Sequence, residues 1–274
     1  MKKQRYQILL VNDDGIHSPG LWAAANALSP LGFVTVAAPR DQASSTGRSL
    51  PSTSDGRIEK IQLKIGEEEW PVYSVGGTPA QVVLHAVMEI MPVQPDLVVS
   101  GINYGENVGT SVTVSGTVGA AMEAAAAGIP AMAVSLELLN GGFYEYTPDV
   151  DFSTAAHFAH FFAAELLQKR MPPDVDILKV EVPAHATPQT PWRLTRLAHH
   201  RYYTPVLERS GTWNDPGYVG VCIDLKPGDV SPDSDIHTLV FDHMVAVTPL
   251  SLDMTSRVDL GGFEQMLRKS TGSR

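Results

Sequence analysis

The chain has 274 residues, of which 43% are hydrophobic and 18% charged, so it can bury a large core and is not a disordered protein. Its formal net charge of −10 disfavours a partner such as a nucleic-acid polymer, because proteins that bind polymer phosphates present a basic surface. The single cysteine excludes an internal disulfide, and no apolar run approaches the ~20 residues of a membrane span, so we expect a cytoplasmic protein with no membrane contact.

Strand and helix signals alternate along the first two thirds of the chain. Short apolar runs predict buried strands at residues 7–12, 33–39, 96–102, 131–136 and 177–183, with a β excursion at 56–75. Helices are predicted at residues 19–30, 79–90, 117–128 and 152–169. Ser18 and Thr78 each precede a proline and are expected to be N-caps. Residues 41–50 and 103–116 are expected to be loops.

Continuous apolar strands separated by helices are typical of a parallel sheet that is covered on both faces. We therefore expect an α/β fold of the Rossmann-like, doubly wound type, with a mainly parallel sheet. From about residue 184 strand-like segments replace helices. This change predicts a core at residues 1–183 and an appended β-rich portion at 184–274, which ends in a short helix.

The adjacent carboxylates of Asp13 and Asp14 directly follow the first buried strand, in the sequence V-N-D-D-G. Like charges at a half-buried strand end repel each other and lose hydration, and a bound cation removes that cost. Oxygen ligands suit Mg²⁺ or Mn²⁺ better than zinc or copper. By itself, D-D-G is equally compatible with an ordinary turn in which an aspartate caps the next helix.

The loop at residues 103–117 is rich in glycine and hydroxyl groups and leads into a helix. Glycines allow backbone N–H groups to approach an anion, Ser115 and Thr117 add hydroxyl donors, and the helix N-terminus favours a phosphate. The chain contains neither a Walker loop nor G-x-G-x-x-G after the first strand, which argues against a P-loop ATPase and a dinucleotide oxidoreductase. Together, the carboxylates and this loop predict hydrolysis of small phosphate monoesters by a metal-activated water.

Several segments together resemble the SurE family, the survival-protein E nucleotidases. The matching segments are I-L-L-V-N-D-D-G-I-H-S-P-G-L at 8–21, A-P-R-D-Q-A-S-S-T-G-R-S at 38–49, G-G-T-P-A at 76–80, L-V-V-S-G-I-N-Y-G-E-N-V-G at 97–109 and S-G-T-V-G-A-A-M-E-A at 115–124. The resemblance extends over nearly the whole chain.

The resemblance implies a metal-dependent 5′/3′-nucleotidase that acts on nucleoside monophosphates, with short polyphosphate as a further substrate. It implies one Mg²⁺ or Mn²⁺ per subunit, a catalytic role for the core at residues 1–183, and a homodimer or homotetramer built partly through a C-terminal oligomerisation arm within residues 184–274. The implied metal ligands are Asp13, Asp14, Ser44 and Asn103, with Asp13 as the catalytic residue and Asn12 supporting it. The implied phosphate contacts are Asn107, Ser115, Gly116 and Thr117.

The sequence departs from the family pattern at a few positions. Gln81 and Val82 stand where the family usually has Asp and Cys, and Lys179 and Glu181 replace asparagines in a later strand. None of these residues is an implied metal ligand. They leave open an alternative, in which the chain is a non-catalytic nucleotide-binding or assembly protein on the same scaffold.

Overall fold

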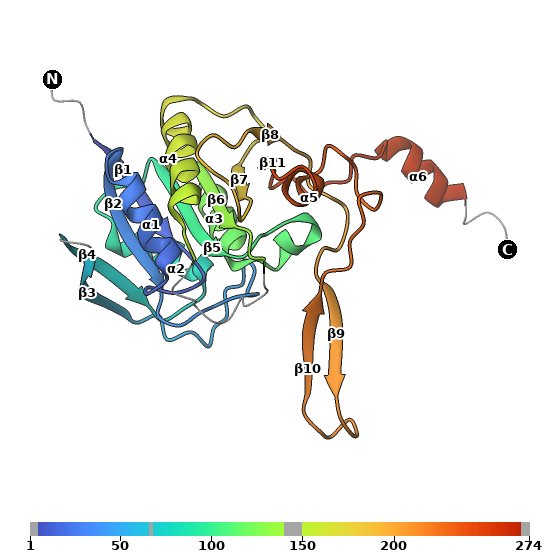
Figure 1. Ribbon diagram of the computed structural model, residues 1–274, viewed down its shortest axis with the longest axis horizontal. Helices are drawn as coiled ribbons and strands as arrows, with labels where there is room; N and C mark the ends of the chain where they lie inside the picture. The colour runs from blue at the N-terminus through green and yellow to red at the C-terminus, as the bar shows by residue number, and fades with distance from the viewer. Residues whose placement is uncertain (1–4, 66–67, 140–149, 270–274) are drawn as a thin grey trace.

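A single large sheet forms the centre of the protein in the computed structural model, which describes residues 5–65, 68–139 and 150–269. The sheet has nine strands in the order β3-β4-β2-β1-β5-β6-β7-β11-β8, and a separate hairpin pairs β9 with β10 (Figure 1). The strands are β1 (Tyr6–Val11), β2 (Gly32–Pro39), β3 (Ile58–Ile65), β4 (Glu68–Val75), β5 (Leu97–Tyr104), β6 (Ala131–Leu136), β7 (Ile177–Val182), β8 (Trp192–Leu194), β9 (Thr204–Arg209), β10 (Gly217–Cys222) and β11 (Val245–Leu250).

The central six strands, from β4 through β2, β1, β5 and β6 to β7, are parallel neighbours. Strand β3 pairs antiparallel with β4 at one edge, and β11 pairs antiparallel with β7 toward the other. This arrangement confirms the predicted α/β class with a mainly parallel, doubly wound sheet.

Helices cover both faces of the sheet. The helices are α1 (Pro19–Leu28), α2 (Pro79–His85), α3 (Gly116–Ala126), α4 (Ser153–Gln168), α5 (Asp235–Val240) and α6 (Leu260–Lys269), with a π-helix at Ala86–Ile90 and a 3₁₀ helix at Gly109–Thr113. Ile8 and Leu10 of β1 belong to a core with residues of α1 and α4, whereas Leu9 and Val11 belong to a second core with residues of α2 and α3. Burial of alternate side chains on opposite faces explains why this strand is apolar throughout.

The part of the chain after residue 183 adds strands β11 and β8 to the same sheet. In Figure 1 the β9–β10 hairpin projects downward, away from the sheet, and α6 extends to the right beyond α5. Strand β9 and helix α5 have no counterpart in the elements expected from the sequence. The division into two parts near residue 183 stays a prediction.

Two local expectations need correction. Ser18 occupies the N-cap position of α1, but its hydroxyl makes no capping hydrogen bond and is buried without a partner among the described residues. The segment 103–116 is not a continuous loop, because β5 extends to Tyr104 and a 3₁₀ helix occupies 109–113. Thr78, by contrast, caps α2 as expected, in a reciprocal pair with Gln81.

None of the helices within the described ranges is sufficiently long and apolar to cross a membrane.

Candidate functional site

Polar segments follow three strands that are neighbours in the sheet. Strand β1 lies between β2 and β5, so the order of the strands changes direction here: β2 and β4 lie on one side of β1, and β5, β6 and β7 lie on the other. A ligand site in an open α/β sheet forms at such a position, beyond the carboxyl ends of the strands. Residues 12–15 follow β1, Ser44 follows β2, and the 105–109 loop follows β5 (Figure 1).

The turn after β1 is built by Asn12 and Gly15. The Asn12 side chain donates to the Gly15 carbonyl at 3.0 Å and accepts from the Gly15 N–H at 3.2 Å. Gly15 has a φ of +94°, a conformation that side-chain-bearing residues rarely adopt. Asn12 is fully buried, so its contribution is to fix the turn that carries the two aspartates.

Asp13 is almost closed to water, with 4% of its surface exposed. Its Oδ1 accepts a hydrogen bond of 2.5 Å from the Thr117 hydroxyl, and its backbone carbonyl accepts from the Ala43 N–H at 2.7 Å. Gly116 lies so close that an added Cβ would be 2.8 Å from the Asp13 side chain. Burial raises the pKa of Asp13 above its usual value, although the hydrogen bond from the Thr117 hydroxyl to the carboxylate opposes the shift.

Asp14 has the same low exposure as Asp13. Its Oδ2 accepts from the Tyr104 N–H at 3.1 Å, and its Oδ1 from the Gln42 side chain at 3.5 Å. Burial, followed by repulsion from Asp13, raises the pKa of Asp14 to about 8. Two adjacent carboxylates whose pKa values are raised in this way form a site where a cation would be strongly stabilised.

Ser44 and Asn103 line the same cleft as Asp13. The Ser44 hydroxyl accepts a 3.1 Å hydrogen bond from Gln42, the side chain that also reaches Asp14. The Asn103 amide nitrogen donates to the Gly105 carbonyl at 2.6 Å, which leaves its amide oxygen as the group for a cation. The four expected metal ligands therefore come from three neighbouring strand ends.

The expected phosphate contacts have different surroundings. Asn107 and Ser115 line the cleft. The Asn107 side chain donates to the Ser135 hydroxyl at 3.0 Å, and the Ser115 hydroxyl caps α3 by accepting from the Val118 N–H at 3.1 Å. Thr117, which is fully buried, donates its hydroxyl proton to Asp13, so in this structure it orients a carboxylate.

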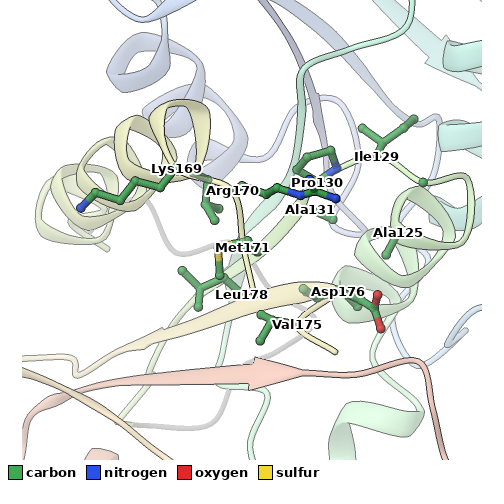
Figure 2. A pocket seen from close by; sticks show the side chains of 13 residues that line it. Ala125, Ile129, Pro130, Ala131, Lys169, Arg170, Met171, Val175, Asp176 and Leu178 are labelled. Carbon is green, nitrogen blue, oxygen red and sulfur yellow. The ribbon is translucent and has the colours of Figure 1, made fainter. Parts of the chain in front are cut away.

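The cleft has a volume of about 560 Å³ and runs from Asp13 to the base of the β9–β10 hairpin. Its lining includes Asn107 and Ser115 together with Arg201, Tyr203 and Val219, and the Tyr203 hydroxyl donates to the Glu106 carbonyl at 3.0 Å. A separate cavity of about 240 Å³ lies beside the amino ends of β6 and β7, between Ile129, Arg170 and Asp176 (Figure 2). Because it lies at the opposite end of the strands, it is not part of the carboxylate site.

The structure also accounts for two departures from the expected motifs. Gln81 caps α2 and additionally binds Ser54 and the Pro51 carbonyl, so it secures the loop that precedes the helix. Lys179 and Glu181 are completely buried and form ion pairs, which no pattern of the sequence indicated.

The chain is similar to known proteins over nearly its whole length. The family model described as Survival protein SurE matches residues 8–204. A protein named 5′-nucleotidase SurE from Thermococcus gammatolerans is 41% identical over 263 residues, which cover 95% of this chain and 96% of the relative. A protein of the same name from Methanosarcina mazei is 38% identical over 266 residues, with 95% and 97% coverage. The crystal structure of the SurE protein from Aquifex aeolicus superimposes with a TM-score of 0.74 at 30% identity, covering 95% of this chain and 99% of that one.

Proposed function

The chain belongs to the SurE family, and we propose that it is a metal-dependent nucleotidase that hydrolyses nucleoside 5′-monophosphates to nucleoside and phosphate. The observation that carries this proposal is the buried pair of adjacent carboxylates, Asp13 and Asp14, at the switch point of the sheet. The names of the relatives supply the substrate class, and the cleft beside the pair supplies room for a small organic phosphate.

A hard divalent cation fits the residues at this site. Within the described parts of the chain, no Lys or Arg forms an ion pair with Asp13, so its buried charge has no basic partner there. Asp13, Asp14, Ser44 and Asn103 would hold Mg²⁺ or Mn²⁺, both of which prefer oxygen ligands. The described residues contain no cluster of three or more His, Cys, Asp or Glu side chains suited to a metal, which agrees with a site completed by neutral oxygens.

When bound, the metal would supply a water molecule of lowered pKa and positive charge beside the phosphate. The chain's own contribution is to orient the ester. The N–H groups of Gly116 and Thr117, at the start of α3, donate to the Asp13 carboxylate, so the helix N-terminus holds the proposed metal ligand in place. The Ser115 hydroxyl accepts from Val118, so its proton remains for a phosphate oxygen, and Asn107 retains a second amide N–H for the same purpose.

Asn12 and Thr117 both position Asp13. Asn12 holds the turn, and Thr117 fixes the orientation of the carboxylate through its short hydrogen bond. Both residues are buried completely, so we assign them supporting roles and reserve the catalytic role for Asp13.

We extend the proposal to 3′-monophosphates and short polyphosphate as further substrates, and to a homodimer or homotetramer as the working assembly. Apolar side chains that remain exposed on the hairpin and α6 support the assembly, among them Leu207, Trp213, Val219, Phe263 and Leu267. Light scattering of the full chain should give a mass of two or four subunits.

Phosphate release from adenosine 5′-monophosphate and from p-nitrophenyl phosphate tests the main proposal. We expect turnover with Mn²⁺ or Mg²⁺ and its loss in EDTA. Nucleotide binding without metal-dependent turnover would favour the alternative of a non-catalytic nucleotide-binding protein on the same scaffold. Parallel assays of 5′- and 3′-monophosphates and polyphosphate rank the substrates.

A further inference from the structure

Three charged side chains are completely buried beside the cleft. Lys179 and Glu181 lie on the same side of β7, two residues apart, and Asp235 is the first residue of α5. The Lys179 ammonium is 3.1 Å from Asp235 Oδ2 and 3.4 Å from Glu181 Oε1, and all three side chains have zero exposure. We call these residues the Lys179 cluster.

The two carboxylates of the Lys179 cluster bind the backbone of the loop that lines the cleft. Glu181 Oε2 accepts from the Asn107 N–H at 2.9 Å, and Asp235 Oδ2 accepts from the Gly109 N–H at 3.1 Å. Asn107 is therefore held at its backbone by Glu181 and at its side chain by Ser135.

The same cluster is connected to a second segment that lines the cleft. Asp235 Oδ1 accepts from the Ala198 N–H at 2.9 Å, at the start of the segment that carries Arg201 and Tyr203. Farther along that segment, the His200 carbonyl accepts from the Thr110 N–H at 3.0 Å. A single buried carboxylate thus binds the backbone of both segments.

Stability alone gives little reason for this cluster. A buried ion pair generally stabilises a fold no more than well-packed apolar side chains of similar volume, because both charges lose their hydration. The two carboxylates keep the pKa of Lys179 above its usual value despite its burial, so the cluster retains its positive centre. Charged acceptors, however, form stronger and shorter hydrogen bonds to N–H groups than neutral ones, which favours a positioning role.

We propose that Lys179, Glu181 and Asp235 are positioning residues for phosphate binding, which hold Asn107 and the neighbouring 198–203 segment in the relative position that the ester requires. The inference rests on the proposed function, in which Asn107 contacts the phosphate. The cluster touches no substrate; Lys179 holds the two carboxylates, and they hold the loop.

Glu181→Leu is the decisive variant, because it removes the acceptor for the Asn107 N–H. Loss of a charge-assisted contact of this kind should raise KM for adenosine 5′-monophosphate about 10-fold while kcat changes little, as expected for loss of uniform substrate binding. The dissociation constant of inorganic phosphate, measured by calorimetry with Mg²⁺, should weaken by the same factor.

Two variants separate positioning from general destabilisation. Glu181→Gln keeps an acceptor oxygen, so its KM should rise less, within about 3-fold. Thr248→Val alters a buried residue that lies directly opposite Lys179 in β11 but whose hydroxyl binds Thr195. It should lower the unfolding temperature without changing KM or phosphate affinity.

An equal KM and equal phosphate affinity in Glu181→Leu and Thr248→Val would overturn the proposal. If Glu181→Leu does not fold, Asp235→Asn takes its place, since it keeps the side-chain shape and weakens the contact with Gly109; an unchanged KM there has the same consequence. A wild-type chain that binds phosphate without turnover contradicts the proposed function alone, and the calorimetric comparison still decides the inference. Absence of phosphate binding in the wild type contradicts both.

Discussion

Two groups of buried carboxylates lie near the cleft and differ in how their charge is balanced. Glu181 and Asp235 share the ammonium of Lys179, which belongs to the same strand as Glu181. Asp13, by contrast, accepts hydrogen bonds from neutral groups and forms no ion pair within the described ranges. Both groups are almost closed to water, with 4% exposure at Asp13 and none at Glu181 and Asp235.

The difference indicates which group is made to receive a ligand. Charge that the fold balances internally can hold a backbone segment in place, because it needs nothing from outside. Charge that the fold leaves without a basic partner, as at Asp13 within the described residues, favours a cation. Substitutions that neutralise one charge should therefore have opposite effects on stability in the two groups.

Asp13→Asn should have the largest effect. Loss of this carboxylate should lower kcat at least about 1,000-fold, because it removes a proposed metal ligand and the proposed catalytic group. In EDTA, the unfolding temperature should stay equal or rise, because one of two repelling carboxylates is gone. Asp41→Asn, which changes an exposed aspartate on the next loop, is the matched control and should keep full activity. Retained turnover in Asp13→Asn would show that the ligand assignment is wrong.

Lys179→Met should have the opposite effect on the stability of the metal-free protein. It leaves Glu181 and Asp235 buried without their cation, and removal of one partner from a buried ion pair typically costs about 3–5 kcal/mol of unfolding free energy. Urea denaturation of the metal-free protein measures this difference. A stability equal to that of the wild type would mean that the cluster is hydrated in solution, and the contrast with Asp13 would disappear.

Gly116→Ala probes the geometry around Asp13 without changing any charge. The added methyl group would be 2.8 Å from the Asp13 side chain and 3.1 Å from the Ala43 carbonyl, so Asp13 must move. A displacement of this kind should lower kcat about 10- to 100-fold, whereas the helix itself should tolerate alanine well. Gly228→Ala, in an exposed turn that does not line the cleft and has no neighbouring atom within 4 Å of the added methyl group, is the matched control. Equal activity of the two variants would contradict a tightly positioned Asp13.

The sequence was sufficient to predict the centre of the fold and the place of the site. Apolar runs such as Ile8–Val11 identify strands that are buried on both faces, and parallel strands bring their carboxyl ends to one edge. Asp13, Ser44 and Asn103 consequently line one cleft, although up to 90 positions separate them in the sequence. The roles of these residues remain proposals.

The partners of individual side chains could not be predicted in the same way. Lys179 has one partner, Glu181, within its own apolar strand. Its second partner, Asp235, lies 56 residues away on a helix of six residues, which is too short to show a periodic pattern. The Thr117 hydroxyl donates to Asp13, a partner that the sequence did not indicate, and its contact with a phosphate stays a prediction. Ser18 occupies the N-cap position of α1, but its hydroxyl is buried and makes no capping hydrogen bond.

Glu181→Gln should have the smallest effect on the free energy of unfolding, and this effect should depend on pH. Burial raises the pKa of Glu181 from 4.5 to about 7, despite the attraction of Lys179. Between these values the folded chain holds a proton that the unfolded chain has released, so the free energy of unfolding should decrease as pH rises. A single group contributes at most about 1.4 kcal/mol per pH unit. The contribution is complete below pH 4.5 and lost as pH passes about 7.

Because glutamine cannot release this proton, urea denaturation at pH 5 and pH 7.5 should show a smaller decrease in the free energy of unfolding for the variant than for the wild type. Equal decreases in the two proteins would mean that Glu181 is already ionised at pH 5, with its charge fully balanced by Lys179.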